Sequence, residues 1–148
     1  CLFIGGGPLP LTAIVLASAY GVTVDVLDCD RHSVVLARQV IAALGLQQKI
    51  RIREADAFDF KRFSAYPCIF MAALVGERPS QKNRLLQSIA RQVKHGAVVV
   101  VRSACGLKTL LYPPVESVSV GRLKLQFELH PFSEKIINST LIFCAESV

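Results

Sequence analysis

LFIGGGPLPLT, residues Leu2 to Thr12, places a glycine-rich turn between a short apolar segment and a segment suited to a helix. Glycine allows a sharp turn with positive φ and leaves the backbone open to a ligand. The N–H groups at the start of the following helix then face that ligand. The spacing departs from the strict dinucleotide pattern, and the alternative is a glycine turn without a ligand. We interpret the stretch as a site for a nucleotide-like group.

The composition fits one domain over residues 1–148, with 52% apolar and 19% charged residues. The chain opens with Cys1 on the first expected core strand, so we expect it to be part of a longer protein. The longest apolar stretches, residues 69–75 and 97–101, are too short to cross a bilayer. They are typical of buried strands, and we expect no membrane partner.

The cysteines and the charge exclude several kinds of site. Five cysteines contain no C-x-x-C pair and lie mostly in or beside apolar runs, which favours reduced thiols in a cytoplasmic protein over zinc binding. The net charge is +6, but the basic residues are spread from Arg31 to Lys135 without interleaved aromatic residues. We therefore expect no nucleic-acid partner.

Strand-length apolar runs alternate with segments of helical period, which predicts a parallel sheet wrapped by helices. Helices are expected at residues 11–19, 31–44 and 80–93, with Asp30 and Ser80 as N-caps and Gly45 as a stop. Strands are expected at residues 2–5, 23–28, 50–54, 67–73, 97–102, 122–129 and 136–145. The last two must pair antiparallel, so we predict an α/β fold of five parallel strands ending in an antiparallel hairpin.

Two carboxylates follow neighbouring strands. Asp28 lies 23 residues after Gly5, close to the spacing at which an acid binds ribose hydroxyls. The alternatives for Asp28 are a plain strand-end acid or a helix cap. Asp56, with the backbone of Ala57, is placed to meet adenine. A second acid and a final hairpin are typical of S-adenosylmethionine-binding sheets, the Rossmann-like class I methyltransferase type, rather than of nicotinamide-binding ones.

Several segments together resemble the nicotianamine synthase family and its archaeal and bacterial relatives. The fourth strand ends in small and apolar residues, unlike the polar residue and prolines of many amino-methylating enzymes. The matching segments extend in order over nearly the whole chain: FIGGGPLPLT (Phe3–Thr12), AALVG (Ala72–Gly76), RSA (Arg102–Ala104) with Gly106, LYP (Leu111–Pro113), and His130-Pro131 with Asn138-Ser139.

The resemblance implies transfer of the aminocarboxypropyl group of S-adenosylmethionine to a small amine or amino-acid acceptor in metallophore biosynthesis, with release of methylthioadenosine. No metal or further cofactor is required, because the sulfonium already activates the carbon and leaves as a neutral sulfide. Carried onto this chain, the family's roles place the cofactor turn at Gly5, Gly6, Gly7 and Pro8, ribose on Asp28, and adenine on Asp56 and Ala57.

The acceptor side is less defined. Arg102 is a candidate to hold a substrate carboxylate, with an ion pair to a nearby acid as the alternative. Tyr112 is a candidate pocket residue, with a packed loop tyrosine as the alternative, and His130 is interpreted as a turn residue that could also act as a base. No role transfers to Cys105, where plant members usually have histidine.

The resemblance also implies a helical portion before this sheet, which we expect to be absent from this chain, so these residues name no catalytic base. The sequence also predicts neither the acceptor's identity nor an oligomeric state. Two other functions remain open: a methyltransferase with the same cofactor residues, and a non-catalytic module of the same fold.

Overall fold

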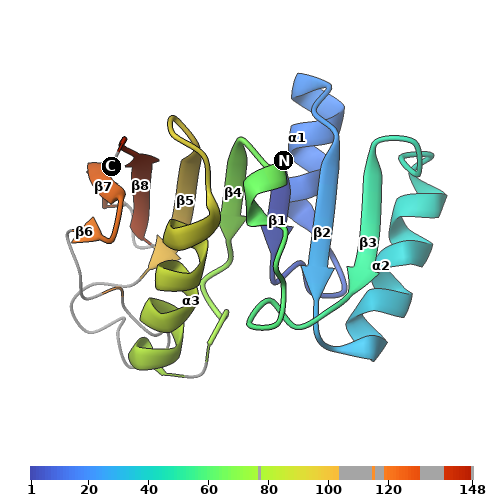
Figure 1. The fold of residues 1–148 in the computed structure, drawn as a ribbon. Helices are drawn as coiled ribbons and strands as arrows, with labels where there is room; N and C mark the ends of the chain where they lie inside the picture. Colours follow the sequence, from blue (N-terminus) through green and yellow to red (C-terminus); the bar gives the residue numbers. More distant parts are fainter. Residues whose placement is uncertain (77, 104–114, 116–118, 131–138, 148) are drawn as a thin grey trace. The chain divides into compact units, whose positions relative to one another are not determined.

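A computed structural model describes the chain at residues 1–76, 78–103, 115, 119–130 and 139–147. The chain divides into two compact units, Cys1–Phe60 and Lys61–Val148. Both consist of strands and helices (Figure 1). None of the helices in the described ranges is long and apolar enough to span a membrane.

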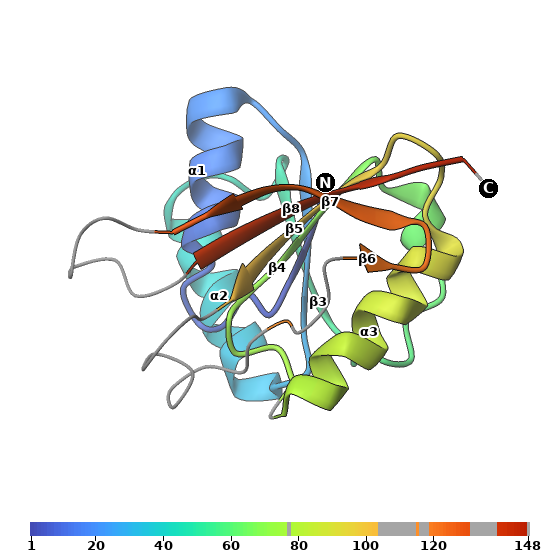
Figure 2. The ribbon, with the colours of Figure 1, turned by 90° about the vertical axis from the view of Figure 1, so that its left-hand side faces the viewer.

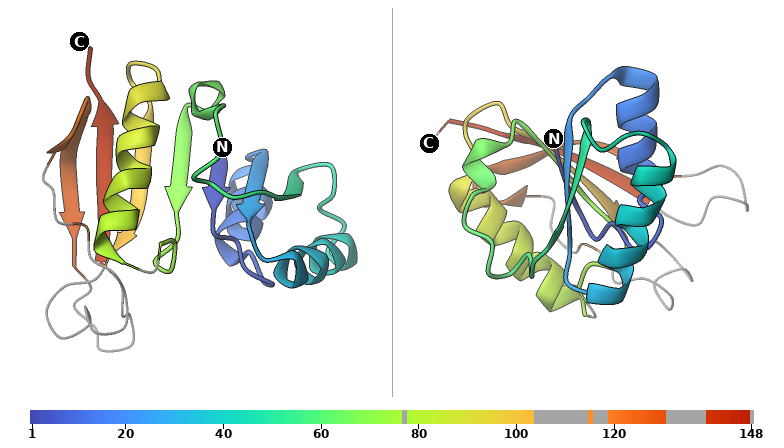
Figure 3. Two further views of the ribbon diagram at one scale, coloured as in Figure 1. Left: turned by 60° about the horizontal axis from the view of Figure 1, so that its bottom comes forward. Right: turned by 90° about the vertical axis from the view of Figure 1, so that its right-hand side faces the viewer.

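The first unit is a parallel three-stranded sheet with the strand order β3-β2-β1. Helices α1 and α2 lie on one side of β2 and β3 in the right-hand view of Figure 3 and pack on these strands. The predicted elements are confirmed to within a residue or two. Their bounds are β1 (Leu2–Ile4), α1 (Leu11–Tyr20), β2 (Val24–Asp28), α2 (Arg31–Ala43) and β3 (Ile50–Glu54).

Helix α2 begins and ends where the sequence predicts. The Asp30 side chain accepts hydrogen bonds from the backbone N–H groups of His32 (3.3 Å) and Ser33 (2.8 Å), which confirms Asp30 as the N-cap. Gly45, with φ +68°, follows the last turn and confirms the expected stop. The buried face is narrower than the apolar pattern suggests, because Val35 and Leu44 are 45% and 53% exposed.

The second unit has the strand order β4-β5-β8-β7-β6, parallel between β4 and β5 and antiparallel in the rest. Figure 2 shows α3 on one side of β5, β8 and β7. The predicted antiparallel hairpin is confirmed as β7 and β8, and β6 is an additional short strand. The bounds are η1 (Phe63–Ala65), β4 (Cys68–Met71), α3 (Pro79–Gln92), β5 (Val98–Ser103), β6 (Ser119–Val120), β7 (Leu123–Leu129) and β8 (Ser139–Ala145).

Helix α3 begins two residues earlier than its predicted cap implies. The prediction that Ser80 caps α3 is wrong: the N-cap is Arg78, whose N–H donates to the Gln81 side chain at 3.2 Å, and Pro79 is the first helical residue. Proline suits that position because its φ is preset and its missing N–H would have no helical partner. The predicted start of the last strand at Ile136 falls outside the described residues.

The turn after β1 packs directly on β2. The Gly5 and Gly6 N–H groups both donate to the Leu27 carbonyl, at 2.8 and 3.4 Å. A Cβ at Gly6 would lie 2.3 Å from the Cγ1 of Val26, so a side chain there would require the Val26 side chain or the turn to shift. The absence of a side chain at Gly6 therefore sets how closely the turn approaches the sheet.

One lysine is completely buried in the second unit. Lys82 lies in the first turns of α3, and its Nζ donates to the carbonyl of Ala73 at 2.7 Å and to that of Arg102 at 3.0 Å. Burial lowers the pKa of Lys82 from about 10.5 to about 8. The two carbonyls supply part of the hydrogen bonding that a buried ammonium group needs.

We expect Gly6→Ala to lower the free energy of unfolding by about 1–3 kcal/mol, because the methyl group overpacks the contact with Val26. The measurement is denaturant unfolding, with a shifted midpoint at an unchanged slope. The matched control is Ser18→Ala on the exposed side of α1, for which we expect a change within about 0.5 kcal/mol. Equal midpoints for Gly6→Ala and wild type would contradict the packing described.

The buried lysine also predicts a pH dependence of stability. Because the pKa of Lys82 is lower in the folded chain than in the unfolded one, the unfolded chain binds more protons between about pH 8 and pH 10.5. The free energy of unfolding should therefore rise through this window by up to about 1.4 kcal/mol per pH unit relative to Lys82→Met, which cannot titrate there. Urea unfolding of both proteins at pH 7.5, 8.5 and 9.5 measures it. A difference independent of pH would refute it.

Candidate functional site

The glycine turn has the conformation that the sequence predicts. Gly5 and Gly7 have φ values of +79° and +63°, which residues with a side chain rarely adopt. Gly6 is buried against β2, whereas Gly5 and Gly7 are partly accessible and Pro8 is exposed. The accessible backbone of the turn thus lies between the end of β1 and the start of α1.

The first turn of α1 has no side-chain cap. Pro10 occupies the N-cap position and its side chain makes no capping hydrogen bond. Backbone N–H groups at an uncapped helix start carry partial positive charge and can bind an anion or a polar ligand atom. This property agrees with the predicted cofactor turn without assigning a ligand to it.

The Asp28 carboxylate connects the turn to the next helix. One of its oxygens accepts the Gly7 N–H at 2.7 Å, and the other accepts the Asp30 N–H at 2.9 Å. Asp28 stands at the carboxyl end of β2 and is partly buried. It is not the side-chain cap of α2, which is Asp30. Each carboxylate oxygen can accept more than one hydrogen bond, so both can also accept from ligand hydroxyls.

Asp56 and Ala57 follow β3, one strand further along. The Asp56 Oδ1 accepts the Phe58 N–H at 2.8 Å, which makes a local turn. Asp56 is exposed, and Ala57 is buried. The Ala55 N–H donates to the Asp28 carbonyl at 2.9 Å, so the ends of β2 and β3 remain paired beside these residues.

The ends of β2 and β3 form an acidic region. The pKa of the Cys29 thiol is raised, first by partial burial and then by the negative charges of Asp28, Asp56 and Asp30. Three carboxylates, those of Asp28, Asp30 and Asp56, therefore lie close to one thiol at these strand ends. Such a region suits hydroxyl and amino donors and a cationic ligand.

Arg102 lies at the carboxyl end of β5, and its side chain is exposed. Across the described ranges, Arg102 takes part in no ion pair, so the structural alternative of a pair with a nearby acid is not seen there. Tyr112 and Cys105 lie outside the described residues. Ser103, the last residue of β5, is buried and its Oγ accepts the Val115 N–H at 3.0 Å.

His130 immediately follows β7, as the interpretation of a turn residue requires. Its Nδ1 lies 2.9 Å from the Ser139 Oγ at the start of β8, and its Nε2 lies 3.5 Å from the Glu128 carboxylate. These contacts link His130 to both strands of the hairpin. The interpretation of His130 as a turn residue that could also act as a base stays a prediction.

Two buried charged residues were missed by sequence reasoning. Lys82 stands in a polar stretch at the start of α3, where nothing in the pattern indicates burial. Asp25 is buried within β2 and pairs with Arg51 at 2.7 Å and Arg53 at 3.5 Å on β3. The signal for Asp25 was available, because an acid inside an apolar strand faces two arginines spaced by two on the neighbouring strand.

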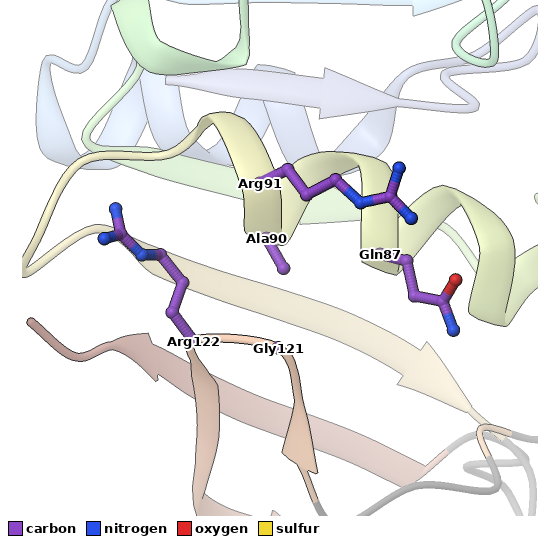
Figure 4. Close-up of a pocket in the computed structure, with 5 residues that line it drawn as sticks. All are labelled: Gln87, Ala90, Arg91, Gly121 and Arg122. Atoms are coloured by element: carbon purple, nitrogen blue, oxygen red, sulfur yellow. The ribbon is translucent and has the colours of Figure 1, made fainter. Parts of the chain in front are cut away.

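A separate hollow of about 610 Å³ lies between α3 and the β6–β7 turn (Figure 4). The guanidinium groups of Arg91 and Arg122 point in opposite directions in Figure 4, and Arg122 donates to the Val93 carbonyl at 3.1 Å. Their charges do not converge, so this hollow is not a candidate anion site. In the part of the chain that the structure describes, no cluster of His, Cys, Asp or Glu could hold a metal ion.

Comparison with known proteins identifies the family. The family profile described as nicotianamine synthase protein matches residues 1–147. Nicotianamine synthase 2 of Arabidopsis thaliana is 34% identical over 144 residues, which cover 95% of this chain and 45% of that protein. Nicotianamine synthase 9 of Hordeum vulgare is also 34% identical, over 95% of this chain and 43% of that protein. The chain thus spans less than half the length of these relatives.

The chain is also similar to solved structures. MtNAS in complex with MTA and tNA is 28% identical, has a TM-score of 0.82, and matches over 97% of this chain and 52% of its own. The magnesium protoporphyrin IX methyltransferase of Synechocystis, with bound SAH, is 13% identical with a TM-score of 0.78, over 98% of this chain and 73% of its own. This second likeness concerns the fold alone. The predicted α/β class, the sheet of S-adenosylmethionine-dependent methyltransferases ending in antiparallel strands, is confirmed, and the chain belongs to the nicotianamine synthase family.

Proposed function

We propose that this chain binds S-adenosylmethionine and serves an aminocarboxypropyl transfer to an amine. The observation that carries the proposal is the bond between the Gly7 N–H and the Asp28 carboxylate, which holds the glycine turn beside an acid suited to ribose. Family membership and the presence of MTA in the MtNAS complex support the same ligand class.

The first unit supplies the donor-binding residues in this proposal. Gly5, Gly6, Gly7 and Pro8 form the turn that receives the donor, and the acidic end of β2 favours its cationic sulfonium. Asp28 accepts ribose hydroxyls. The Asp56 carboxylate accepts a hydrogen bond from the adenine amino group, while the Ala57 N–H donates one to a ring nitrogen.

The residue proposed to bind a carboxylate is Arg102. Arg102 offers a planar set of donors that matches a carboxylate, and its exposed side chain has no competing acid among the described residues. Tyr112 is proposed as a second pocket residue from the family resemblance. The acceptor in this proposal is a small amine or an amino acid, and the product belongs to metallophore biosynthesis.

The chemistry of the transfer is a displacement at carbon. The unprotonated acceptor nitrogen attacks the carbon of the aminocarboxypropyl arm that is bonded to sulfur. A C–N bond forms, the C–S bond breaks with its electrons moving to sulfur, and neutral methylthioadenosine leaves. The acceptor nitrogen then loses a proton. The protein contributes orientation of the arm and exclusion of water, and no metal is needed because the sulfonium is already activated.

We propose a cytoplasmic location. The described cysteines, Cys1, Cys29, Cys68 and Cys144, are free thiols. Unpaired thiols are typical of a reducing compartment.

The transfer is tested by the products formed from S-adenosylmethionine. The complete gene product, incubated with S-adenosylmethionine and a panel of amines and amino acids, should release methylthioadenosine together with an N-alkylated amino acid, as measured by mass spectrometry. Release of S-adenosylhomocysteine would instead identify a methyltransferase, which shares the fold. Failure of calorimetry to detect binding of S-adenosylmethionine would leave the non-catalytic module.

Asp28→Ala should weaken binding of methylthioadenosine by about 1–3 kcal/mol. The substitution removes the charged hydrogen bonds to ribose, and it also removes the carboxylate that accepts the Gly7 N–H in the turn. Isothermal titration calorimetry measures the change. Asp59→Ala, at an exposed acid in the same unit, is the matched control and should leave the dissociation constant unchanged. An unchanged constant for Asp28→Ala itself would remove the ribose assignment.

A further inference from the structure

Lys82 joins two segments that the ladder between β4 and β5 does not pair with each other, although Arg102 is paired on its other side with Thr140 of β8. The last pair of residues in the parallel ladder between β4 and β5 is Met71 with Val101. Ala73 and Arg102 lie beyond this pair, and their carbonyls are 2.7 and 3.0 Å from the Lys82 Nζ. One ammonium group therefore links the chain after β4 to the last residues of β5.

The loop after β4 is held tightly against the start of α3. Gly76 has φ +80°, and a Cβ there would lie 3.1 Å from the Lys82 backbone nitrogen. The Val75 N–H also donates to the Ala72 carbonyl at 3.4 Å. The Lys82 side chain thus reaches its two acceptors from a helix start whose own position is fixed by close packing.

Burying an ammonium group costs more free energy than burying an apolar side chain of similar size. The next turn of α3 places the fully buried Leu85 and Leu86 in the same core, and an apolar side chain at position 82 would avoid the cost of desolvating a charge. What lysine provides, and an apolar residue cannot, is directed hydrogen bonding to two strand ends at once. Both are carboxyl ends of parallel strands, and in this class of fold ligands bind beyond the carboxyl ends of the strands.

Of the two hydrogen bonds of Lys82 described above, the one to the Arg102 carbonyl connects Lys82 to a proposed binding residue. Lys82 holds the backbone carbonyl of Arg102, while the Arg102 guanidinium remains exposed and is not ion-paired with any described acid. We propose that Lys82 is a positioning residue that fixes the backbone of Arg102 so that its guanidinium meets the carboxylate of the donor's aminocarboxypropyl arm. This inference rests on the proposed function. It adds the donor carboxylate as the group that Arg102 recognises and Lys82 as the residue that aims it.

The test compares S-adenosylmethionine with its decarboxylated form, because the two ligands differ by the carboxylate alone. Calorimetry on the complete gene product gives the dissociation constant of each ligand. For Lys82→Met we expect about a tenfold loss of affinity for S-adenosylmethionine, the scale of a hydrogen bond to a charged group, and less than about a twofold change for the decarboxylated ligand. Arg102→Met should show the same selective loss.

A double variant separates positioning from general support. If Lys82 acts through Arg102, Lys82→Met combined with Arg102→Met should be no weaker in binding than Arg102→Met alone. Lys94→Met, at an exposed lysine just beyond α3, is the matched control and should bind both ligands as wild type does. An equal loss for both ligands, or additive losses in the double variant, would overturn the positioning role and leave the proposed function standing.

The folding of the variants is measured separately from their binding. Circular dichroism and a cooperative thermal transition establish which variants fold, and Lys82→Gln, which retains an amide donor, provides a second substitution. Failure of both Lys82 variants to fold would assign Lys82 to folding alone and would overturn the inference. A wild-type protein that binds neither ligand would overturn the proposed function itself.

Discussion

The hydrogen bond from the Gly7 N–H to the Asp28 carboxylate is the constraint on which the donor side of the molecule depends. It joins the turn after β1 to the end of β2 at 2.7 Å, and the second carboxylate oxygen continues the link to the start of α2 through the Asp30 N–H. A charge-assisted bond of this kind holds the turn in place before a ligand arrives. The conformation of the turn is therefore part of the folded chain, and ligand binding need not order it.

Much of the fold could be predicted because its signals are local. Apolar runs next to glycine or aspartate define β1 and β2, and the Asp30 cap fixes the start of α2. The alternating pattern of residues 123–129 gives β7 and hence the antiparallel end of the sheet. β6 was missed because two residues carry no periodicity, and the start of α3 was misplaced because Pro79 outweighs Ser80 as a start signal.

The candidate site could be predicted only in part, because residue types are local but contacts are not. The sequence singled out Asp28 by its spacing from Gly5, yet its bond to Gly7 arises only when β1 and β2 pair. The burial of Lys82 is likewise a tertiary property: its neighbours in sequence are polar, and its acceptors lie at the ends of β4 and β5. The described part of the second unit therefore adds a residue to the functional argument that no sequence pattern contained.

In the proposed function, the turn at Gly5–Gly7, held by Asp28, binds the adenosine portion of the donor. The most direct measurement is a crystal structure of the protein grown with methylthioadenosine. We expect the nucleoside to lie over this turn, with its ribose hydroxyls within hydrogen-bonding distance of the Asp28 carboxylate. An empty turn with the nucleoside bound elsewhere, or ribose hydroxyls that do not contact Asp28, would contradict it.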